Sequence, residues 1–250
     1  MATTKRTGIG LLAALLLLSP SGVAAQLPSP AELMAAHNQA IGGEAAFAQH
    51  QALHTTGTFA IPVAGITGGL ETYRVRPNTT LTISMMPGMG ELRGGFNGEV
   101  GWGIDPMNGA RLLSGTELEL VRDQAVFDGD LRQPENFKSV ETVEKTTVGG
   151  QECYKVRLVW RSGRETFDCY SVTNRLLIAR IESHEGQQGR VEALTLLQDY
   201  TDFGGIKLPK RSVTAVLDME QVITIEKVDF APPDPARLEL PPEIKALIRK

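Results

Sequence analysis

The segment Tyr73–Pro106 reads YRVRPNTTLTISMMPGMGELRGGFNGEVGWGIDP and decides the fold class. Runs rich in β-branched and aromatic residues are interrupted here by Pro, Gly and Asn, which favour turns. Between Leu81 and Met86, apolar side chains alternate with other side chains at the period of a half-buried strand. The pair Asn97-Gly98 is typical of a tight hairpin turn. The segment therefore predicts a meander of short antiparallel strands.

Similar strand-like runs continue on both sides of this segment, and we expect about eleven strands in all. A sheet of this size is expected to curl. No repeat and no linker divides the chain, so we predict one α+β, mostly β domain: a large curved antiparallel sheet with helices covering one face. We assign this domain to residues 26–235 and a proline-rich C-terminal tail to residues 236–250, with a short helical turn at Glu243–Ile248.

Three helices are indicated by their start signals. Ser29-Pro30-Ala31-Glu32 combines an N-cap serine, a proline at the first helical position and a capping-box glutamate, which predicts a helix to about Ile41. Gly42-Gly43 ends that helix, and a second is expected from Glu44 to Ala52. A second capping box, Thr116 to Glu119, predicts a mid-chain helix to about Phe127.

The first 25 residues are predicted to be a signal peptide. Lys5 and Arg6 precede the apolar run 9–18, and Val23-Ala24-Ala25 offers small residues for cleavage near Ala25. The alternative is a membrane anchor, but the apolar run is too short to span a bilayer comfortably. No cysteine lies at the cleavage point, so we expect a periplasmic protein that is not a lipoprotein.

Composition and motifs give no sign of nucleic-acid binding, of a metal site or of catalysis. The chain has a net charge of -4 and 42% hydrophobic residues, with no basic excess that would suggest nucleic acid. His50 and His54 are four residues apart, but no carboxylate cluster accompanies them as in a metalloprotease. Asp105, Asp128 and Asp130 lie in turn-like contexts, where aspartate usually bonds its own backbone. We expect no enzyme, no cofactor and no metal site.

The two cysteines lie in one predicted hairpin. Cys153 and Cys169 flank the turn Arg161-Ser162-Gly163-Arg164. A two-residue turn would put the cysteines on opposite faces of the hairpin, whereas a three-residue loop between Trp160 and Arg164 would place them diagonally on one face. In an exported chain we expect them to form a disulfide, and the alternative is two buried thiols.

Alternation in the first strand of that hairpin indicates which side chains face inward. Tyr154, Val156, Leu158 and Trp160 share one face, which we predict to be apolar. Lys155 and Arg157 share the other and are expected to face solvent. Trp160 at the strand end would cover the hairpin.

The segment quoted above resembles the LolA-like superfamily, the outer-membrane lipoprotein-sorting carriers and their relatives. The resemblance is carried by Arg76-Pro77-Asn78, the turn Asn97-Gly98, Trp102 and Asp105-Pro106. It covers roughly Ala31 to Phe230. It implies an unclosed antiparallel half-barrel capped by helices, with an apolar cavity for acyl chains. In the carriers the arginine before the proline bonds the lid helices and gates the cavity, and Arg76 matches that position; the alternative is an ordinary salt bridge.

The cavity and its rim are expected to involve apolar side chains from the same segment. We predict that Leu81, Ile83 and Trp102 line the cavity and that Met85, Met86 and Met89 form a flexible rim, because methionine adapts to varied apolar shapes. The alternative is that these methionines pack beneath a helix. We expect Arg74, Arg76 and Arg93 to latch the lid or to face the head group of a ligand.

The resulting function prediction is a monomeric carrier or binding protein for a lipid or lipoprotein acyl chain. It would exchange its cargo with a partner protein in the inner or outer membrane, without covalent chemistry. The alternative is a periplasmic sensor or envelope-assembly module on the same scaffold. A weaker third possibility is a hydrolase with a nonstandard site.

Overall fold

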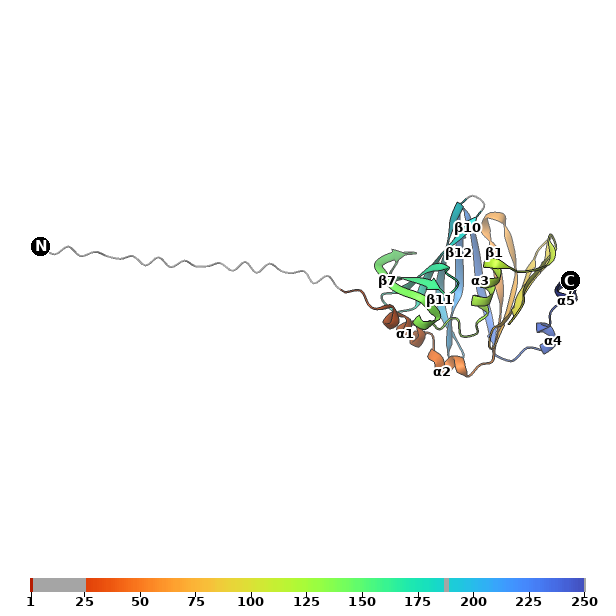
Figure 1. Cartoon of the computed structure of the whole chain (residues 1–250), viewed down its shortest axis with the longest axis horizontal. Helices are drawn as coiled ribbons and strands as arrows, with labels where there is room; N and C mark the ends of the chain where they lie inside the picture. The colour runs from red at the N-terminus through yellow and green to blue at the C-terminus, as the bar shows by residue number, and fades with distance from the viewer. Residues whose placement is uncertain (2–25, 187–188, 250) are drawn as a thin grey trace.

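A computed structural model describes residues 1, 26–186 and 189–249 of the chain (Figure 1). The side chains of residues 184–190 are not described. The predicted signal peptide, apart from Met1, lies outside the described residues.

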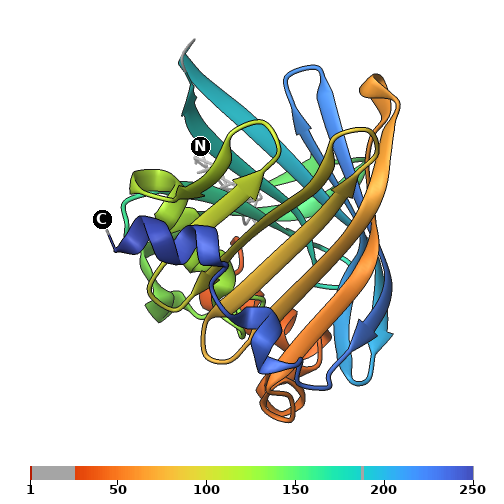
Figure 2. The same cartoon turned by 90° about the vertical axis from the view of Figure 1, so that its right-hand side faces the viewer.

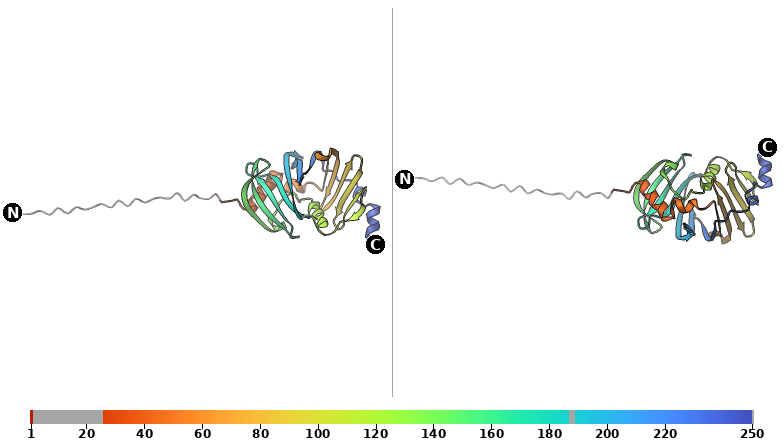
Figure 3. Two further views of the ribbon diagram at one scale, coloured as in Figure 1. Left: turned by 90° about the horizontal axis from the view of Figure 1, so that it is seen from above. Right: turned by 90° about the horizontal axis from the view of Figure 1, so that it is seen from below.

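The domain is built on one antiparallel sheet of thirteen strands in the described chain, in the order β6-β5-β4-β3-β2-β1-β13-β12-β11-β10-β9-β8-β7. The order begins at β6 and ends at β7, so the sheet is not closed, and it curves strongly around its inner face (Figures 2 and 3). The predicted fold class is confirmed. The strands are β1 (Ala52–Ile61), β2 (Ile66–Val75), β3 (Thr79–Met86), β4 (Gly90–Asn97), β5 (Gly101–Asp105), β6 (Gly109–Leu112), β7 (Phe137–Val148), β8 (Gln151–Trp160), β9 (Glu165–Ser171), β10 (Leu177–Gly186), β11 (Gly189–Phe203), β12 (Ile206–Val216) and β13 (Met219–Asp229).

The strand that the sequence did not indicate is β6. It has only four residues, and its pairing with β5 places Ala110 opposite Ile104. Asp105 at the end of β5 accepts hydrogen bonds from the backbone N–H groups of Met107 and Asn108, at 2.9 and 2.7 Å. That turn brings the chain back alongside β5. The strand β6 therefore forms by pairing with β5 and has no alternating sequence pattern that would predict it.

Two α-helices precede the sheet. In α1 (Pro30–Ala40), Ser29 and Glu32 form the predicted capping box, with the Ser29 N–H donating to Glu32 Oε2 at 2.8 Å. The helix α2 (Gly43–Ala48) is shorter than predicted. Gly42 between them has φ of 119°, and a side chain there would collide with the backbone of Gly205.

The mid-chain helix α3 (Gly115–Ala125) begins earlier than predicted. Ser114 is its N-cap residue, so the expected capping box from Thr116 to Glu119 does not start the helix. The Ser114 carbonyl accepts from the Leu118 N–H at 3.4 Å, which brings the first helical turn forward. Short 3-10 turns lie between β1 and β2, at η1 (Pro62–Ala64), and after α3, at η2 (Pro134–Asn136). The last helices are α4 (Pro235–Leu238) and α5 (Pro242–Ile248), of which α5 matches the predicted turn in the tail.

The two faces of the sheet carry different helices. Directly opposite residues of an antiparallel pair share a face, so the register assigns each side chain to one face or the other. We call the face against α1, α2 and α3 the inner face, and the face against α4 and α5 the outer face. On the inner face, Val156, Leu158 and Tyr170 pack with Leu33 and Met34 of α1. The predicted apolar face of β8 is therefore the inner one.

A second cluster on the inner face joins α2 to the start of β1 and the start of β12. The residues buried there are Ile41, Phe47, Leu53, Phe127, Leu131, Ile206 and Leu208. The Lys207 N–H of β12 also donates to the Ile41 carbonyl at 2.9 Å, so the helical segment is hydrogen-bonded to the sheet. Segments far apart in sequence thus close one end of the inner face.

The cysteines do not form the expected disulfide. The Trp160 N–H donates to the Arg164 carbonyl at 2.8 Å, which gives the three-residue loop, and Lys155 lies opposite Cys169. Cys153 and Cys169 are therefore diagonal neighbours on the outer face, and both are free, buried thiols. Diagonal positions are about 7–8 Å apart between Cα atoms, longer than the separation that disulfides favour.

Candidate functional site

A segment that we call the cover lies against the inner face. It comprises α3 and the loop 126–133, which separates α3 from η2. Phe127 and Leu131 are buried in the inner cluster with α2. The Phe127 N–H donates to the Pro77 carbonyl at 3.1 Å, which fixes the loop near the turn between β2 and β3.

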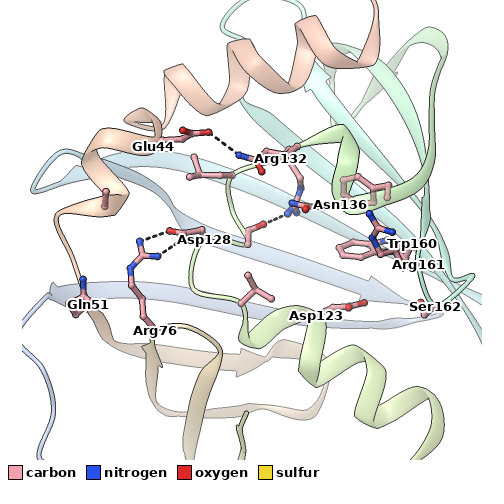
Figure 4. Close-up of a pocket in the computed structure, with 16 residues that line it drawn as sticks. Glu44, Gln51, Arg76, Asp123, Asp128, Arg132, Asn136, Trp160, Arg161 and Ser162 are labelled. Atoms are coloured by element: carbon pink, nitrogen blue, oxygen red, sulfur yellow. Dashed lines mark hydrogen bonds and ion pairs between the residues drawn. The ribbon is translucent and has the colours of Figure 1, made fainter. Parts of the chain in front are cut away.

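Arg76 ties the cover to both the sheet and α2. Its Nη2 donates to Asp128 Oδ1 at 2.6 Å and to the Phe47 carbonyl at 2.9 Å, and its Nη1 donates to Asp128 Oδ2. Its Nε donates to the His50 carbonyl at 2.8 Å. Figure 4 shows the side chain of Arg76 directed at Asp128. Because all these bonds involve one guanidinium, Arg76 joins three segments at a single point.

Arg74 makes a second bond to the same loop. It lies two residues before Arg76 on β2, so both side chains reach the inner face. Its Nη1 donates to Asp130 Oδ2 at 2.8 Å. Burial alone would raise the pKa of the Asp130 carboxyl, but the positive charges of Arg74 and Arg132 outweigh it, and the pKa lies below its ordinary value. The carboxylate is therefore held ionised beside the arginines.

Arg164 links the helical part of the cover to the sheet. Its Nη2 donates to Asp123 Oδ2 of α3 and its Nη1 to Glu182 Oε1 of β10, both at 3.0 Å. The guanidinium also lies 4.3 Å from the centre of the Trp160 ring, a cation–π contact. Three aspartates of the cover thus each pair with an arginine of the sheet.

The deepest charged group is Asp168 on β9, whose side chain is fully buried. Arg132 Nε donates to its Oδ2 at 3.1 Å, and Arg180 Nε donates to its Oδ1 at 2.8 Å. Burial raises the pKa of Asp168 to about 6, and Arg132 opposes that rise. Arg132 also donates to the Gly129 carbonyl, so the cover loop and the buried carboxylate share one guanidinium.

Two adjoining cavities lie beneath and beside the cover. The first, of about 730 Å³, lies between α2, the loop 126–136 and the turn after β8 (Figure 4). The second, of about 450 Å³, lies between α3 and the inner face. Asp123, Gly129, Arg132 and Trp160 border both. Each volume falls in the range of ordinary small-molecule sites, about 300–1,000 Å³.

The second cavity has apolar walls and charged points. Its apolar residues are Leu70, Leu120, Trp160, Leu208, Pro209, Ile223 and Ile225. Its charged side chains include two of the pairs described above, Arg74–Asp130 and Arg164–Asp123, together with Arg132, Arg180 and Glu182. Such a space suits a ligand with a long apolar part and a polar end, because apolar burial gives affinity and a few polar groups fix orientation.

The predicted site residues fall on opposite faces of the sheet. Arg74 and Arg76 lie at the cover. Leu81 and Trp102 instead pack with Tyr73 and with Ile244 of α5 on the outer face, and Ile83 packs against this cluster. Arg93 lies there too, within 3.4 Å of Glu91.

The methionines lie at the turn between β3 and β4. Met85 and Met89 are exposed rather than buried beneath a helix, and Met86 is half-buried.

Sequence reasoning did not find the acidic partners in the cover. Asp105 bonds its own turn as expected, but Asp128 and Asp130 accept from arginines on the sheet. It also did not single out Asp168. One signal was available: Asp168 alternates with Thr166 and Tyr170 on the inner side of β9, where an unpaired charge would be costly.

The described residues hold no group of three or more His, Cys, Asp or Glu side chains arranged to bind a metal ion. Within the same residues, no helix is both long and apolar enough to cross a membrane.

Similarity to solved structures identifies the fold. No protein-family model matches the chain, and no curated protein matches it. The LolA superfamily protein from Nitrosomonas europaea superposes with a TM-score of 0.57 at 11% identity, over 86% of this chain and 99% of that one. The chain has the LolA-like fold.

Two further structures share this LolA-like fold. A DUF1329 family protein from Desulfovibrio piger gives a TM-score of 0.58 at 11% identity and covers 83% of this chain and 95% of that one. A putative outer membrane lipoprotein-sorting protein domain from Vibrio parahaemolyticus gives 0.53 at 8% identity, over 88% and 97% of the two chains. Because the identities are low, the likeness concerns the fold.

Proposed function

We propose that this chain binds a lipid or lipoprotein acyl chain between the inner face and the cover, and carries or presents it without covalent chemistry. The observation that carries the proposal is the 450 Å³ cavity beneath a cover whose three aspartates are paired with arginines of the sheet. The LolA-like fold supports it, since one protein of that fold is described as a lipoprotein-sorting domain.

Energetics favour a bound acyl chain in such a cavity. Each buried methylene contributes about 0.8 kcal/mol, so an acyl chain needs no charged anchor to be retained. The ion pairs that hold the cover are partly exposed, with Asp128 and Asp130 side chains both 40% accessible. Exposed pairs contribute about 0–1 kcal/mol each, so these pairs resist opening only weakly. Buried Phe127 and Leu131 and the buried Arg132–Asp168 pair hold the loop 126–133 more firmly, so α3 is the part of the cover that moves at modest cost. We therefore assign entry and exit of the ligand to movement of the cover.

The place of action is part of the proposal. We propose that residues 1–25 direct export and are removed, so that the protein works in the periplasm as a monomer with a partner protein in one of the membranes. N-terminal sequencing of the exported protein should begin near Gln26. A mature protein that retains Lys5 and Arg6 would contradict this part.

Native mass spectrometry of the exported protein, followed by organic extraction, tests the binding proposal. We expect a bound lipid, fatty acid or lipopeptide in gently prepared protein. Leu120→Arg on α3 and Ile223→Arg on β13 place a charge in the cavity from opposite walls, and each should abolish the bound mass. The matched control is Glu119→Arg, next to Leu120 but exposed.

Two outcomes would count against a lipid carrier. If the wild-type protein is empty in several gentle preparations, and a pull-down recovers one stoichiometric protein, the sensor or assembly module is favoured. If Leu120→Arg and Glu119→Arg retain the same lipid, the ligand does not occupy this cavity. Circular dichroism and unfolding curves of each variant separate loss of binding from loss of folding.

A further inference from the structure

The turns of the sheet fall on two opposite rims, because consecutive antiparallel strands reverse direction at each turn. We call one the upper rim; its turns within the described residues are at 62–65, 87–89, 106–108, 161–164 and 217–218. The pairing of Ala60 with Val222 places the turn 217–218 at the same end as 62–65. The other is the lower rim, with turns at 76–78, 98–100, 149–150, 172–176 and 204–205, and Arg76 of this rim bonds the Phe47 carbonyl of α2.

Exposed apolar side chains gather on the upper rim. Val63, Met107 and Leu217 are 70, 74 and 80% exposed at three of its turns. Met85, Met89 and Met219, which flank or lie in two of them, are also exposed. Figure 2 shows the hairpins β1–β2, β3–β4, β5–β6 and β12–β13 ending along the upper edge of the sheet. Four neighbouring hairpins thus present apolar tips on one rim.

The lower rim provides an internal comparison. Its exposed residues in the described turns are Pro77, Glu99, Gly149, Gly150, Thr173, Asn174, Gly204 and Gly205, with no large apolar side chain among them. Single exposed apolar residues are normal on any protein surface. Their concentration on one rim is not explained by turn formation, because the lower-rim turns form with polar residues and glycine.

The charges next to the four apolar tips are mainly acidic; Arg93 pairs with Glu91, and Arg161 and Arg164 lie at the fifth upper-rim turn. The turn residues 61–66 and 86–90 contain no charged side chain. Next to the tips lie Glu91, Asp105, Asp218 and Glu220, and no lysine lies in the four apolar turns. Surfaces that bind anionic lipids carry clusters of Lys and Arg. The upper rim lacks such a cluster at its apolar tips, so attraction to an anionic surface is not what it offers.

We propose that the upper rim docks on the surface of a lipid bilayer by shallow insertion of these apolar tips. Neighbouring hairpins of a sheet are separated by about 10 Å, two strand spacings, so the tips are separate points rather than one continuous patch. A protein partner of ordinary size would require a continuous complementary surface. A fluid interface accepts separate points, and methionine and leucine adapt to it.

Docking in this orientation would direct the inner cavity toward the membrane. The helices α1 and α2 lie at the lower rim, as the hydrogen bonds of Arg76 and Lys207 show. Trp160 and Arg164, which border the second cavity, lie at the upper-rim turn 161–164. This last consequence rests on the proposed function, whereas docking itself does not require a ligand in the cavity.

Flotation with phosphatidylcholine vesicles tests the inference. The protein is purified after export, and its mass is checked, so that the apolar run 9–18 does not itself bind the vesicles. We expect the wild type to float with the vesicles. Val63→Asp, Met107→Asp and Leu217→Asp should each lower the partition coefficient about tenfold, and the triple variant should stay unbound. The control Val143→Asp changes an exposed valine on β7, away from the rim, and should bind as the wild type does.

Lipid composition and occupancy make the test decisive. Binding should neither rise when phosphatidylserine is added nor fall in high salt. Wild-type protein that does not float, a triple variant that still floats, or binding that requires anionic lipid would each overturn the inference. If the wild-type protein does not bind vesicles but the same three residues are needed for binding a protein, the rim is a protein-docking surface and the inference is wrong. Native mass spectrometry on the same samples reports the cavity ligand separately, so failure of docking with lipid still bound leaves the proposed function intact.

Discussion

At the scale of single residues, the arginines of the inner face are notable for the distance of their partners in sequence. Arg76 bonds Asp128 and Arg74 bonds Asp130, so two ion pairs join the end of β2 and the turn after it to the cover loop. The motif Arg-Pro-Asn marked Arg76 in advance, but nothing local to Asp128 indicated its partner. The role of Arg76 in gating stays a prediction.

Replacing Asp128 should loosen the cover. Asp128→Asn keeps the size but removes the charge that Arg76 contacts, and we expect faster hydrogen exchange at residues 123–133. The loss should be on the order of 1 kcal/mol of local opening free energy, because the pair is partly exposed. Asp105→Asn is the matched control, since Asp105 accepts hydrogen bonds from its own turn, at Met107 and Asn108, and lies away from the cover. Equal exchange in the two variants would show that the Arg76 pair does not hold the cover.

His37 should make stability depend on pH. Its Nδ1 accepts from the Leu177 N–H at 3.2 Å, which requires a neutral ring. Its pKa is lowered from 6.5 to about 4, mainly by burial and also by the charge of Arg132, while Asp130 acts in the opposite direction. The unfolded chain therefore binds the proton at higher pH than the folded one. Stability from this group is present above pH 6.5 and is lost as the pH falls toward 4, by about 3 kcal/mol in total.

Urea unfolding at pH 7, 5.5 and 4.5 measures that loss. His37→Gln can still accept a hydrogen bond but does not titrate, so its stability should fall less between pH 7 and 4.5 than that of the wild type. His54→Gln, on the outer face beside Glu71, is the control. Parallel curves for the wild type and His37→Gln would rule out His37 as the source.

At the scale of elements, α5 shows how a tail becomes part of the fold. Three apolar side chains of the sheet, Tyr73, Leu81 and Trp102, would be exposed on the outer face without it. Ile244 is fully buried against them, while Ile248 on the same helix is 46% exposed. The C-terminal segment therefore completes a second apolar core on the side of the sheet away from the cavity.

Shortening the buried residue of α5 should destabilise the protein. Ile244→Ala removes three carbon atoms from a packed site and is expected to cost about 2–4 kcal/mol of unfolding free energy. Ile248→Ala on the same helix should cost less than about 0.5 kcal/mol, because the side chain is largely in solvent. Thermal unfolding compares the two. Equal effects would mean that α5 is not docked in solution.

At the scale of the whole molecule, an unclosed sheet has two edges that need protection. The edge strand β7 carries exposed Glu141, Glu144 and Lys145, and its register shifts between Thr142 and Glu144. Charges and bulges of this kind discourage pairing with a second chain. These features protect the β7 edge, and the monomer stays a prediction.

Removing those charges should promote self-association. The triple variant Glu141→Val, Glu144→Val and Lys145→Val should form dimers or larger species in light scattering coupled to size exclusion. The control replaces Glu220, Glu226 and Lys227 by valine on β13, an interior strand of the sheet, and changes the net charge by the same amount. A control that associates equally would point to general loss of solubility rather than to edge pairing.

Much of the architecture was predictable because its causes are local. Alternation, turn residues and the Ser29 capping box determine strands, hairpins and the start of α1 through bonds between near neighbours. The sequence therefore predicted a curved antiparallel sheet with helices on one face. It also established that Tyr154 and Trp160 share a side of β8.

What only the tertiary structure decided is which side of each strand faces the cavity and which charges meet. Alternation shows that Leu81 and Ile83 share a face, but α5, about 160 residues later, makes it the outer one. The pairing of β1 with β13, the bonds from Arg74 and Arg76 to the cover, and the diagonal placement of Cys153 and Cys169 likewise depend on register and on long-range packing. Burial is shared among distant segments, so a pattern within one strand cannot assign it.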